Sequence, residues 1–228
     1  MSEKMIKLIH GIVEFRETML PKYAERFRHL ADGQSPDALF ITCSDSRVVP
    51  ELLASTDPGE LFVNRNVGNM IPPATVEGSS TGDLSEAAGI EFAVNVLGVE
   101  NIIVCGHSEC GAMRAALDPT AAPKDSNLGK WLHHCASAVF RLQQEGPLDS
   151  TLTVQNQLSQ MNVLLQLEHL MTYPIVRERV EAKKIRICGW WFEIRSGEMH
   201  AFNRQTRKFE PIDRETSVAI IERIASGR

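Results

Sequence analysis

The sequence predicts an α/β fold in which helices flank a mostly parallel central β-sheet, with a helical arm at the N-terminus. Short apolar runs of strand type, at 38–43, 60–64 and 101–105, alternate with longer segments of helical periodicity. Strands that alternate with helices favour a parallel sheet covered by those helices. The 228 residues contain no linker, so we expect one domain over 1–228.

The arm is expected over residues 1–32, because apolar residues within 4–31 recur at roughly helical spacing as far as a break near Pro21. The run at 38–43 is continuously apolar, which is typical of a strand buried on both faces, and 60–64 has the same character. The strand at 101–105 is the clearest of the three and ends at Gly106.

The rest of the chain is assigned by the same patterns. Glycine, proline and hydroxyl residues over 68–83 predict a long loop, and a strand is expected from Lys184, with a hairpin around Ser196 and Gly197. Pro174 suits a helix start, and Asp213 could cap the last helix. The expected helices are 84–98, 110–117, 127–145, 150–172, one that starts at Pro174, and 213–225.

Composition excludes several classes of protein. Hydrophobic residues make up 43% and charged residues 23% of the chain, which is the balance of a globular protein and not of a disordered or fibrous one. The formal net charge of −5 argues against nucleic acid as a partner, since phosphate binding needs a basic surface. No run approaches the roughly 18 apolar residues of a membrane helix, and the charged N-terminus is no secretory signal. We therefore expect a cytoplasmic protein that acts on a small molecule.

The five cysteines are an odd number and a poor disulfide framework, so reduced thiols are expected. Such thiols are available for metal binding or catalysis. Cys105, Cys135 and Cys188 are interpreted as small buried hydrophobic residues. The neighbouring His133 and His134 lie about 100° apart on a helix and are interpreted, with Cys135, as helix packing.

Two polar segments each follow a predicted strand. The first is CSDSR at 43–47 and the second is GHSECG at 106–111. Loops at the carboxyl ends of parallel strands lie at one edge of a sheet, so these segments can converge. Cys43, His107 and Cys110 would then offer two thiolates and one imidazole, a ligand set that suits tetrahedral Zn²⁺.

Three protein ligands leave a fourth position on the metal. Asp45 is the nearest candidate, either as a ligand itself or as the group that orients a bound water. Arg47 can pair with that carboxylate and so decide between an open and a closed site. The backbone N–H of Gly111, at a helix start, could donate to a developing oxyanion. A non-catalytic zinc site closed by Asp45, or a thiol enzyme using Cys110 with His107, remain alternatives.

Together these motifs resemble the β-class carbonic anhydrases, in particular the plant-type branch and its bacterial relatives. The resemblance covers most of the chain. It includes DGQSP at 32–36, PGELFVNRNVGN at 58–69, GIEFAVNVLGVENIIVCGH at 89–107 and LMTYPIVRERV at 170–180. The loop over 71–88 is longer than is usual in that family.

The resemblance implies reversible hydration of CO₂ to bicarbonate and a proton by zinc-bound hydroxide, with one zinc per chain. Cys43, His107 and Cys110 would be the permanent ligands and Asp45 with Arg47 the catalytic pair, Asp45 becoming a fourth ligand in an inactive state. The implied substrate-binding residues are Gln34, Phe62, Phe92 and Gly111.

In the plant-type branch the residue that matches Gln34 comes from a partner subunit, and a tyrosine stands at the position of Phe92. The resemblance also implies a homodimer or higher homo-oligomer on which the arm packs. A COS or CS₂ hydrolase on the same scaffold is the alternative function, because the same nucleophile could attack those molecules.

Overall fold

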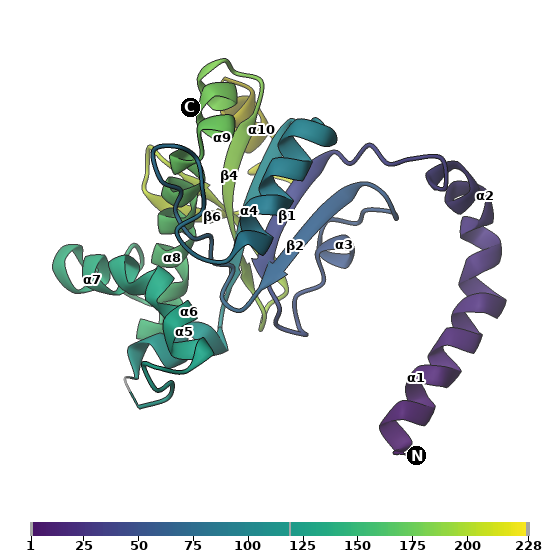
Figure 1. Cartoon of the computed structure of the whole chain (residues 1–228), viewed down its shortest axis with the longest axis horizontal. Helices are drawn as coiled ribbons and strands as arrows, with labels where there is room; N and C mark the ends of the chain where they lie inside the picture. Colours follow the sequence, from purple (N-terminus) through teal and green to yellow (C-terminus); the bar gives the residue numbers. More distant parts are fainter. Residues whose placement is uncertain (1, 119, 227–228) are drawn as a thin grey trace.

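The computed structural model of the chain describes residues 2–118 and 120–226, whose strands form one six-stranded sheet of order β2-β1-β3-β4-β5-β6 (Figure 1). The first four strands in that order are parallel, and β5 and β6 are antiparallel. The predicted α/β class and mostly parallel sheet are confirmed. The strands are β1 Ala38–Cys43, β2 Leu61–Asn66, β3 Asn101–His107, β4 Arg186–Glu193, β5 Glu198–Asn203 and β6 Lys208–Pro211.

Strands β1 and β2 were both expected to be buried on both faces, but only β1 is. All six residues of β1 are buried, as its continuous apolar run predicts. Most residues of β2 are only half-buried. Because β2 is the edge strand and pairs only with β1 among the described strands, the expectation that it is buried on both faces is wrong for this chain. The expected hairpin joins β4 to β5, and Gly197 adopts φ 76° there, a conformation that favours glycine.

The helices lie close to the predicted positions. They are α1 Glu3–Glu14, α2 Leu20–Leu30, α3 Pro50–Leu53, α4 Leu84–Glu91, α5 Gly111–Leu117, α6 Asn127–Leu132, α7 Ala136–Glu145, α8 Val154–Thr172, α9 Pro174–Glu181 and α10 Ser217–Ser226. Two π-helical turns, η1 Phe15–Met19 and η2 Phe92–Val96, and one 3₁₀ turn, η3 His133–Cys135, interrupt them. Within the described ranges, no helix combines the length and apolar character needed to cross a membrane.

Several helix boundaries differ from the sequence prediction for local reasons. In the arm, the π-helical turn η1 separates α1 from α2 close to Pro21, as expected, and Pro21 itself lies in the first turn of α2, where its missing N–H costs little. Helix α8 begins at Val154 and not at residue 150. The Thr153 side chain caps its first turn by accepting a hydrogen bond from the Asn156 N–H. Asp213 accepts from two backbone N–H groups in the turn before α10, so the helix starts four residues after it.

The N-terminal arm, defined here as α1, η1 and α2, stands away from the sheet (Figure 1). None of its residues from 3 to 30 is buried. Its base is tied to the body by Arg26, whose guanidinium donates to Glu60 Oε1 at 2.7 Å and to the Pro58 carbonyl at 2.7 Å. Its exposed apolar residues include Ile6, Leu8, Ile9, Ile12, Val13 and Phe15.

Helix α8 packs tightly against β3 and β4. A Cβ added at Gly106 would lie 2.7 Å from Val163 Cγ2, and one added at Gly189 would lie 3.0 Å from Val163 Cγ1. Both glycines therefore allow the helix to approach the sheet more closely than any larger residue would. This approach brings one face of α8 over the loops at the carboxyl ends of β1 and β3.

Helix α4 carries a buried acid, Glu86, which is 5% exposed. Burial raises its pKa, and the Asp83 charge adds to that rise, while its own backbone N–H and Asn66 oppose it. A carboxyl group whose pKa is higher in the folded state than in the unfolded state stabilises the fold only while it is protonated. This contribution to the free energy of unfolding is lost as the pH rises through the folded pKa.

We therefore expect Glu86→Gln to raise the melting temperature at pH 8 and to leave it nearly unchanged at pH 4. Thermal denaturation followed by circular dichroism at both pH values checks this prediction. Glu91→Gln, at an exposed position near the end of the same helix, is the control. Equal effects of Glu86→Gln at the two pH values would contradict the prediction.

Candidate metal centre

Cys43, His107 and Cys110 converge at the carboxyl edge of the sheet. Cys43 ends β1, His107 ends β3, and Cys110 immediately precedes α5. Strands β1 and β3 are neighbours in parallel register, with Thr42 opposite Cys105, so their ends lie level. The two Sγ atoms and the imidazole nitrogen lie within 4.8 Å of one another, and all three residues are buried. The cluster can therefore share one metal ion.

The imidazole of His107 is prepared for a metal. Its Nδ1 lies 2.8 Å from the Ser108 carbonyl oxygen, which can only accept, so Nδ1 carries the proton and Nε2 keeps its lone pair. Nε2 is buried and finds no hydrogen-bond partner among the described residues. A buried nitrogen without a partner is costly, and a metal ion at the cluster would satisfy it.

The two neighbouring thiols shift each other's pKa in opposite directions. A hydrogen bond from Cys110 lowers the pKa of Cys43 despite its burial, helped by His107 and by the Gly68 N–H, which lies 3.3 Å from Cys43 Sγ. The contact with Cys43 and burial raise the pKa of Cys110. Metal ligation requires both thiolates and releases any proton that they carry. The donor set of two sulfurs and one nitrogen fits zinc.

Asp45 lies beside the cluster but is held by Arg47. The guanidinium donates from Nε to Asp45 Oδ1 at 2.9 Å and from Nη2 to Oδ2 at 2.7 Å, and the Arg47 backbone N–H donates to Oδ1 at 3.0 Å. These bonds hold the pKa of Asp45 below its usual range. Asp45 Oδ2 is 3.9 Å from His107 Nε2, so a change in the pairing would bring it to the cluster.

Arg65 shapes the loop that carries these groups, and it was not predicted from the sequence. Its guanidinium donates to the carbonyls of Cys43 at 2.9 Å, Asp45 at 2.8 Å and Val48 at 2.8 Å. One side chain therefore satisfies three carbonyls and fixes the turn after β1. The only signal in the sequence is a charged residue inside the NRN segment at the end of a strand.

A polar stripe on α8 supports the loops of the cluster from behind, and it was also missed. Gln155 donates to the Cys110 carbonyl at 2.8 Å, and Ser159 donates to the His107 carbonyl at 2.7 Å. Asn162 donates to the Gly68 carbonyl at 3.0 Å and accepts from Gln166 at 2.8 Å. These polar residues recur every three or four positions and so lie on one helix face, a periodicity that could have revealed them.

We expect Asn162→Leu to lower the free energy of unfolding by about 1–3 kcal/mol, since it leaves the buried Gly68 carbonyl and the Gln166 amide without a partner. Urea denaturation of the variant and of wild type measures the difference. Gln144→Leu, at an exposed position of α7, is the matched control. Equal stability of Asn162→Leu and wild type would show that the stripe is not structural.

Of the remaining predicted site residues, the structure brings only Gly111 beside the cluster of the same chain, and not Gln34, Phe62 or Phe92. Gln34 is exposed in the segment before β1. Phe62 and Phe92 stack with ring centroids 5.7 Å apart, but Phe62 lies opposite Leu39, four residues before Cys43, or about 13 Å along the strand. Gly111 is the first residue of α5 and adjoins Cys110.

The residues His133, His134 and Cys135, which were weighed as another metal-binding cluster, make the contacts of packed helix residues. Cys135 is fully buried, its thiol donates to the Leu132 carbonyl at 3.1 Å, and burial raises its pKa to about 12. The His134 ring meets the Trp131 ring edge-on at 5.4 Å. A thiol with such a raised pKa is a poor nucleophile and metal ligand.

An α/β sheet with two thiols and one imidazole at its carboxyl edge is an α/β protein whose side chains could hold a metal ion. The carbonic anhydrase family model matches residues 38–199. A carbonic anhydrase of Synechococcus elongatus is 43% identical over 214 residues, covering 92% of this chain and 75% of the relative. One of Pseudomonas aeruginosa is 40% identical over 205 residues, covering 90% of each.

Solved structures agree with the sequence relatives. The β-carbonic anhydrase CcaA matches with a TM-score of 0.82 at 34% identity, covering 92% of both chains. A tetrameric β-carbonic anhydrase of Sordaria macrospora matches with a TM-score of 0.76 at 27% identity, covering 89% of this chain and 98% of the relative. The chain therefore belongs to the β-class of the carbonic anhydrase family. These comparisons do not favour the COS or CS₂ hydrolase alternative.

Proposed function

We propose that the protein is a zinc-dependent carbonic anhydrase that hydrates CO₂ reversibly to bicarbonate and a proton. The observation that carries the proposal is the convergence of Cys43, His107 and Cys110 within 4.8 Å, in a chain that belongs to this family. The buried, unpartnered Nε2 of His107 supports a metal at this cluster.

Cys43, His107 and Cys110 would hold the ion. Bound zinc is a Lewis acid that lowers the pKa of water to about 7 and so supplies a nucleophile at neutral pH. Arg47 holds the Asp45 carboxylate off the cluster, so Asp45 would not compete with water for the metal. Held there, the carboxylate would accept a hydrogen bond from the water or hydroxide that attacks CO₂ and would orient it. The Gly111 N–H, next to Cys110, is suited to donate to the bicarbonate oxygen.

We propose a homodimer or a higher homo-oligomer as the active form. The exposed apolar residues of the arm need a partner surface to cover them, and Sordaria macrospora relatives are described as tetrameric. Gln34, Phe62 and Phe92 are far from the cluster of their own chain and would line the substrate pocket of the partner. Residues 1–228 would then form one enzyme domain whose arm, 1–32, packs on the other subunit.

We expect the double substitution of Ile9→Glu with Ile12→Glu to produce monomers, because two charges would be buried without partners in the proposed interface. Light scattering coupled to size-exclusion chromatography measures the mass. Lys4→Glu, which also changes the charge of α1, is the control. A double variant with the mass of wild type would contradict the role of the arm.

We propose the cytoplasm as the compartment, because five free thiols, two of them in the metal cluster, suit a reducing environment.

The function is tested by stopped-flow CO₂ hydration with zinc measured on the same sample, beside an assay with CS₂. The proposal expects CO₂ hydration that scales with zinc content and exceeds CS₂ hydrolysis. Full activity without metal, or a preference for CS₂, would refute it.

A further inference from the structure

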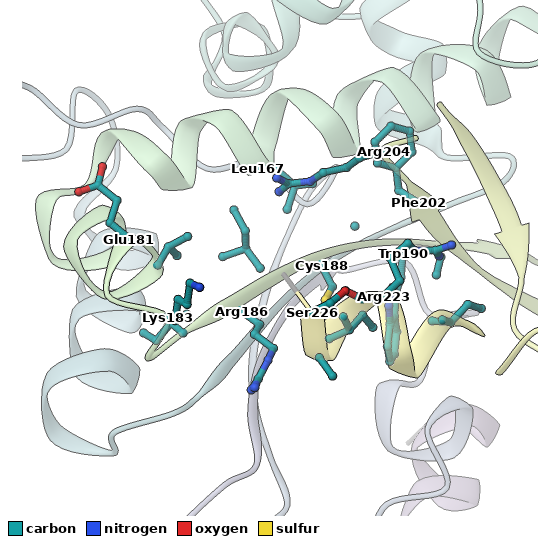
Figure 2. Close-up of a pocket in the computed structure, with 18 residues that line it drawn as sticks. Leu167, Glu181, Lys183, Arg186, Cys188, Trp190, Phe202, Arg204, Arg223 and Ser226 are labelled. Carbon is teal, nitrogen blue, oxygen red and sulfur yellow. The ribbon is translucent and has the colours of Figure 1, made fainter. Parts of the chain in front are cut away.

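Helix α8 reaches two different parts of the molecule along its length. Towards its C-terminal end, Leu167 lines a pocket between α10 and the first half of β4 (Figure 2), and none of the described residues that line this pocket belongs to the loops 43–47 and 106–111. Asn156 lies in the first turn of α8, about 16 Å from Leu167 along the helix. The contacts from α8 to the loops of the metal cluster come from this N-terminal half, where Asn156 is buried.

Glu109 lies between the metal-cluster residues His107 and Cys110 and has an uncommon backbone conformation. Its φ is 53°, which is in the left-handed region, where the side chain of any residue other than glycine crowds the backbone. Such a conformation persists only where neighbouring groups hold it in place. The backbone of Glu109 therefore needs a partner that fixes it.

The Asn156 side chain is that partner. Its Oδ1 accepts a hydrogen bond from the Glu109 N–H at 2.7 Å, and its Nδ2 donates to Glu109 Oε1 at 3.1 Å. The amide thus binds both the backbone and the side chain of a single residue. Arg114 adds only an exposed contact with the Glu109 carboxylate at 3.7 Å, and exposed ion pairs contribute little. Asn156 is therefore the group that holds Glu109 in the left-handed conformation.

The carbonyl that Glu109 presents in this conformation accepts a hydrogen bond from Arg47. Arg47 Nη2 donates to it at 3.0 Å, and the same nitrogen donates to Asp45 Oδ2 at 2.7 Å. Within residues 2–118 and 120–226, the Glu109 carbonyl is the only hydrogen-bond partner of the Arg47 guanidinium besides Asp45. This bond ties the loop after β1 to the loop after β3, and so it helps to set where Asp45 lies relative to His107.

We propose that Asn156 is a positioning residue for the pair of Arg47 and Asp45. By holding Glu109 at a positive φ, it directs the Glu109 carbonyl to Arg47, which keeps Asp45 away from the fourth position on the metal. Without the Asn156 amide, Glu109 relaxes to a negative φ and its carbonyl turns from Arg47. Asp45 then competes with an external ligand for the metal. The proposal rests on the proposed zinc function and adds to it a residue outside the two cluster loops.

A small anion that binds at the fourth position measures this competition. The full-length protein, loaded with cobalt(II) in place of zinc, is titrated with thiocyanate, and the visible absorption of the metal gives the Kd. We expect Asn156→Ala to raise this Kd about tenfold, the lower limit of the cost of losing a hydrogen-bond partner behind a metal site. In the Glu109→Gly background, the same substitution should raise it less than about twofold, because glycine adopts a positive φ without a partner.

Gln157→Ala is the matched control. The Gln157 amide donates to the Leu152 carbonyl at 2.7 Å, at the same end of α8 but outside the cluster loops. This variant should have a lower melting temperature and the wild-type Kd for thiocyanate. An equal rise of the Kd in Gln157→Ala and Asn156→Ala would overturn the proposal, since general loosening of the helix end would then explain both.

Two other results would also overturn it. They are a wild-type Kd in Asn156→Ala, and a tenfold rise of the Kd when Asn156→Ala is added to Glu109→Gly. If Asn156→Ala alone fails to fold or to bind cobalt, the comparison within the Glu109→Gly background decides: a rise of less than about twofold supports the proposal, and a tenfold rise refutes it.

The cobalt spectrum separates this proposal from the proposed function. Thiolate ligands give a sulfur-to-cobalt charge-transfer absorption in the near ultraviolet. A wild-type protein without this absorption would overturn the ligand assignment, the proposed function and the role of Asn156 together. A wild-type protein that shows the absorption, and whose thiocyanate affinity does not depend on Asn156, would overturn the role of Asn156 alone.

Discussion

Cys43→Ser is expected to abolish zinc binding and CO₂ hydration together. The substitution removes one of two sulfur ligands and replaces it with a hydroxyl that stays protonated at neutral pH. Losing only a hydrogen-bond partner behind a metal ligand costs about 10–100-fold in affinity or activity, so losing the ligand itself should cost more. Zinc content by plasma mass spectrometry and stopped-flow hydration, measured on one sample, check this result.

Cys188→Ser is the matched control, because Cys188 is a half-buried thiol on the same sheet that lies outside the cluster. It should keep one zinc per chain and wild-type activity. Circular dichroism of Cys43→Ser should retain the wild-type spectrum, which separates loss of metal from loss of fold. A Cys43→Ser protein that keeps stoichiometric zinc and full activity would refute the ligand assignment.

Arg47→Ala is expected to lower CO₂ hydration at neutral pH by on the order of 100-fold, as misplacement of a reacting group by about 1 Å can do. Arg47 makes three of the hydrogen bonds that hold Asp45, two of them through the side chain that the substitution removes. The freed carboxylate lies near His107 Nε2 and should bind the metal, which closes the fourth position. Stopped-flow kinetics of the zinc-loaded variant measures the loss.

Arg114→Ala is the control, since Arg114 also pairs with a carboxylate, Glu109 at 3.7 Å, but does not contact Asp45. It should retain wild-type kinetics with unchanged zinc. A crystal structure of zinc-loaded Arg47→Ala at neutral pH should show Asp45 on the metal. If Asp45 stayed detached and activity remained high, Arg47 would not control the site.

The sequence predicts strands best where every residue of the strand is buried. The apolar runs of β1 and β3 identify buried strands because both lie inside the sheet, with neighbours on each side. The same reasoning misjudges β2, since an edge position depends on the order of strands and not on local composition. The π-helical turns η1 and η2 were not predicted either, because each is a single turn inside a helical pattern and has no residue signature of its own.

The site residues that could be predicted from the sequence are those that lie in short local motifs. Cys43 and the pair His107 and Cys110 each follow a strand, and parallel pairing of β1 with β3 brings them together. The support from α8 was not found, because the contact between Asn162 and Gly68 joins residues that are far apart in the sequence. The periodicity of α8 marks a polar helix face, but nothing local shows which loop that face contacts.

Zinc K-edge X-ray absorption of the zinc-loaded protein tests the central claim most directly. We predict two sulfur ligands at about 2.3 Å and at least one imidazole nitrogen at about 2.0–2.1 Å, with the sulfur signal reduced in Cys110→Ser. A spectrum with only oxygen and nitrogen around the zinc would mean that Cys43 and Cys110 do not hold it. The proposed mechanism would then be wrong.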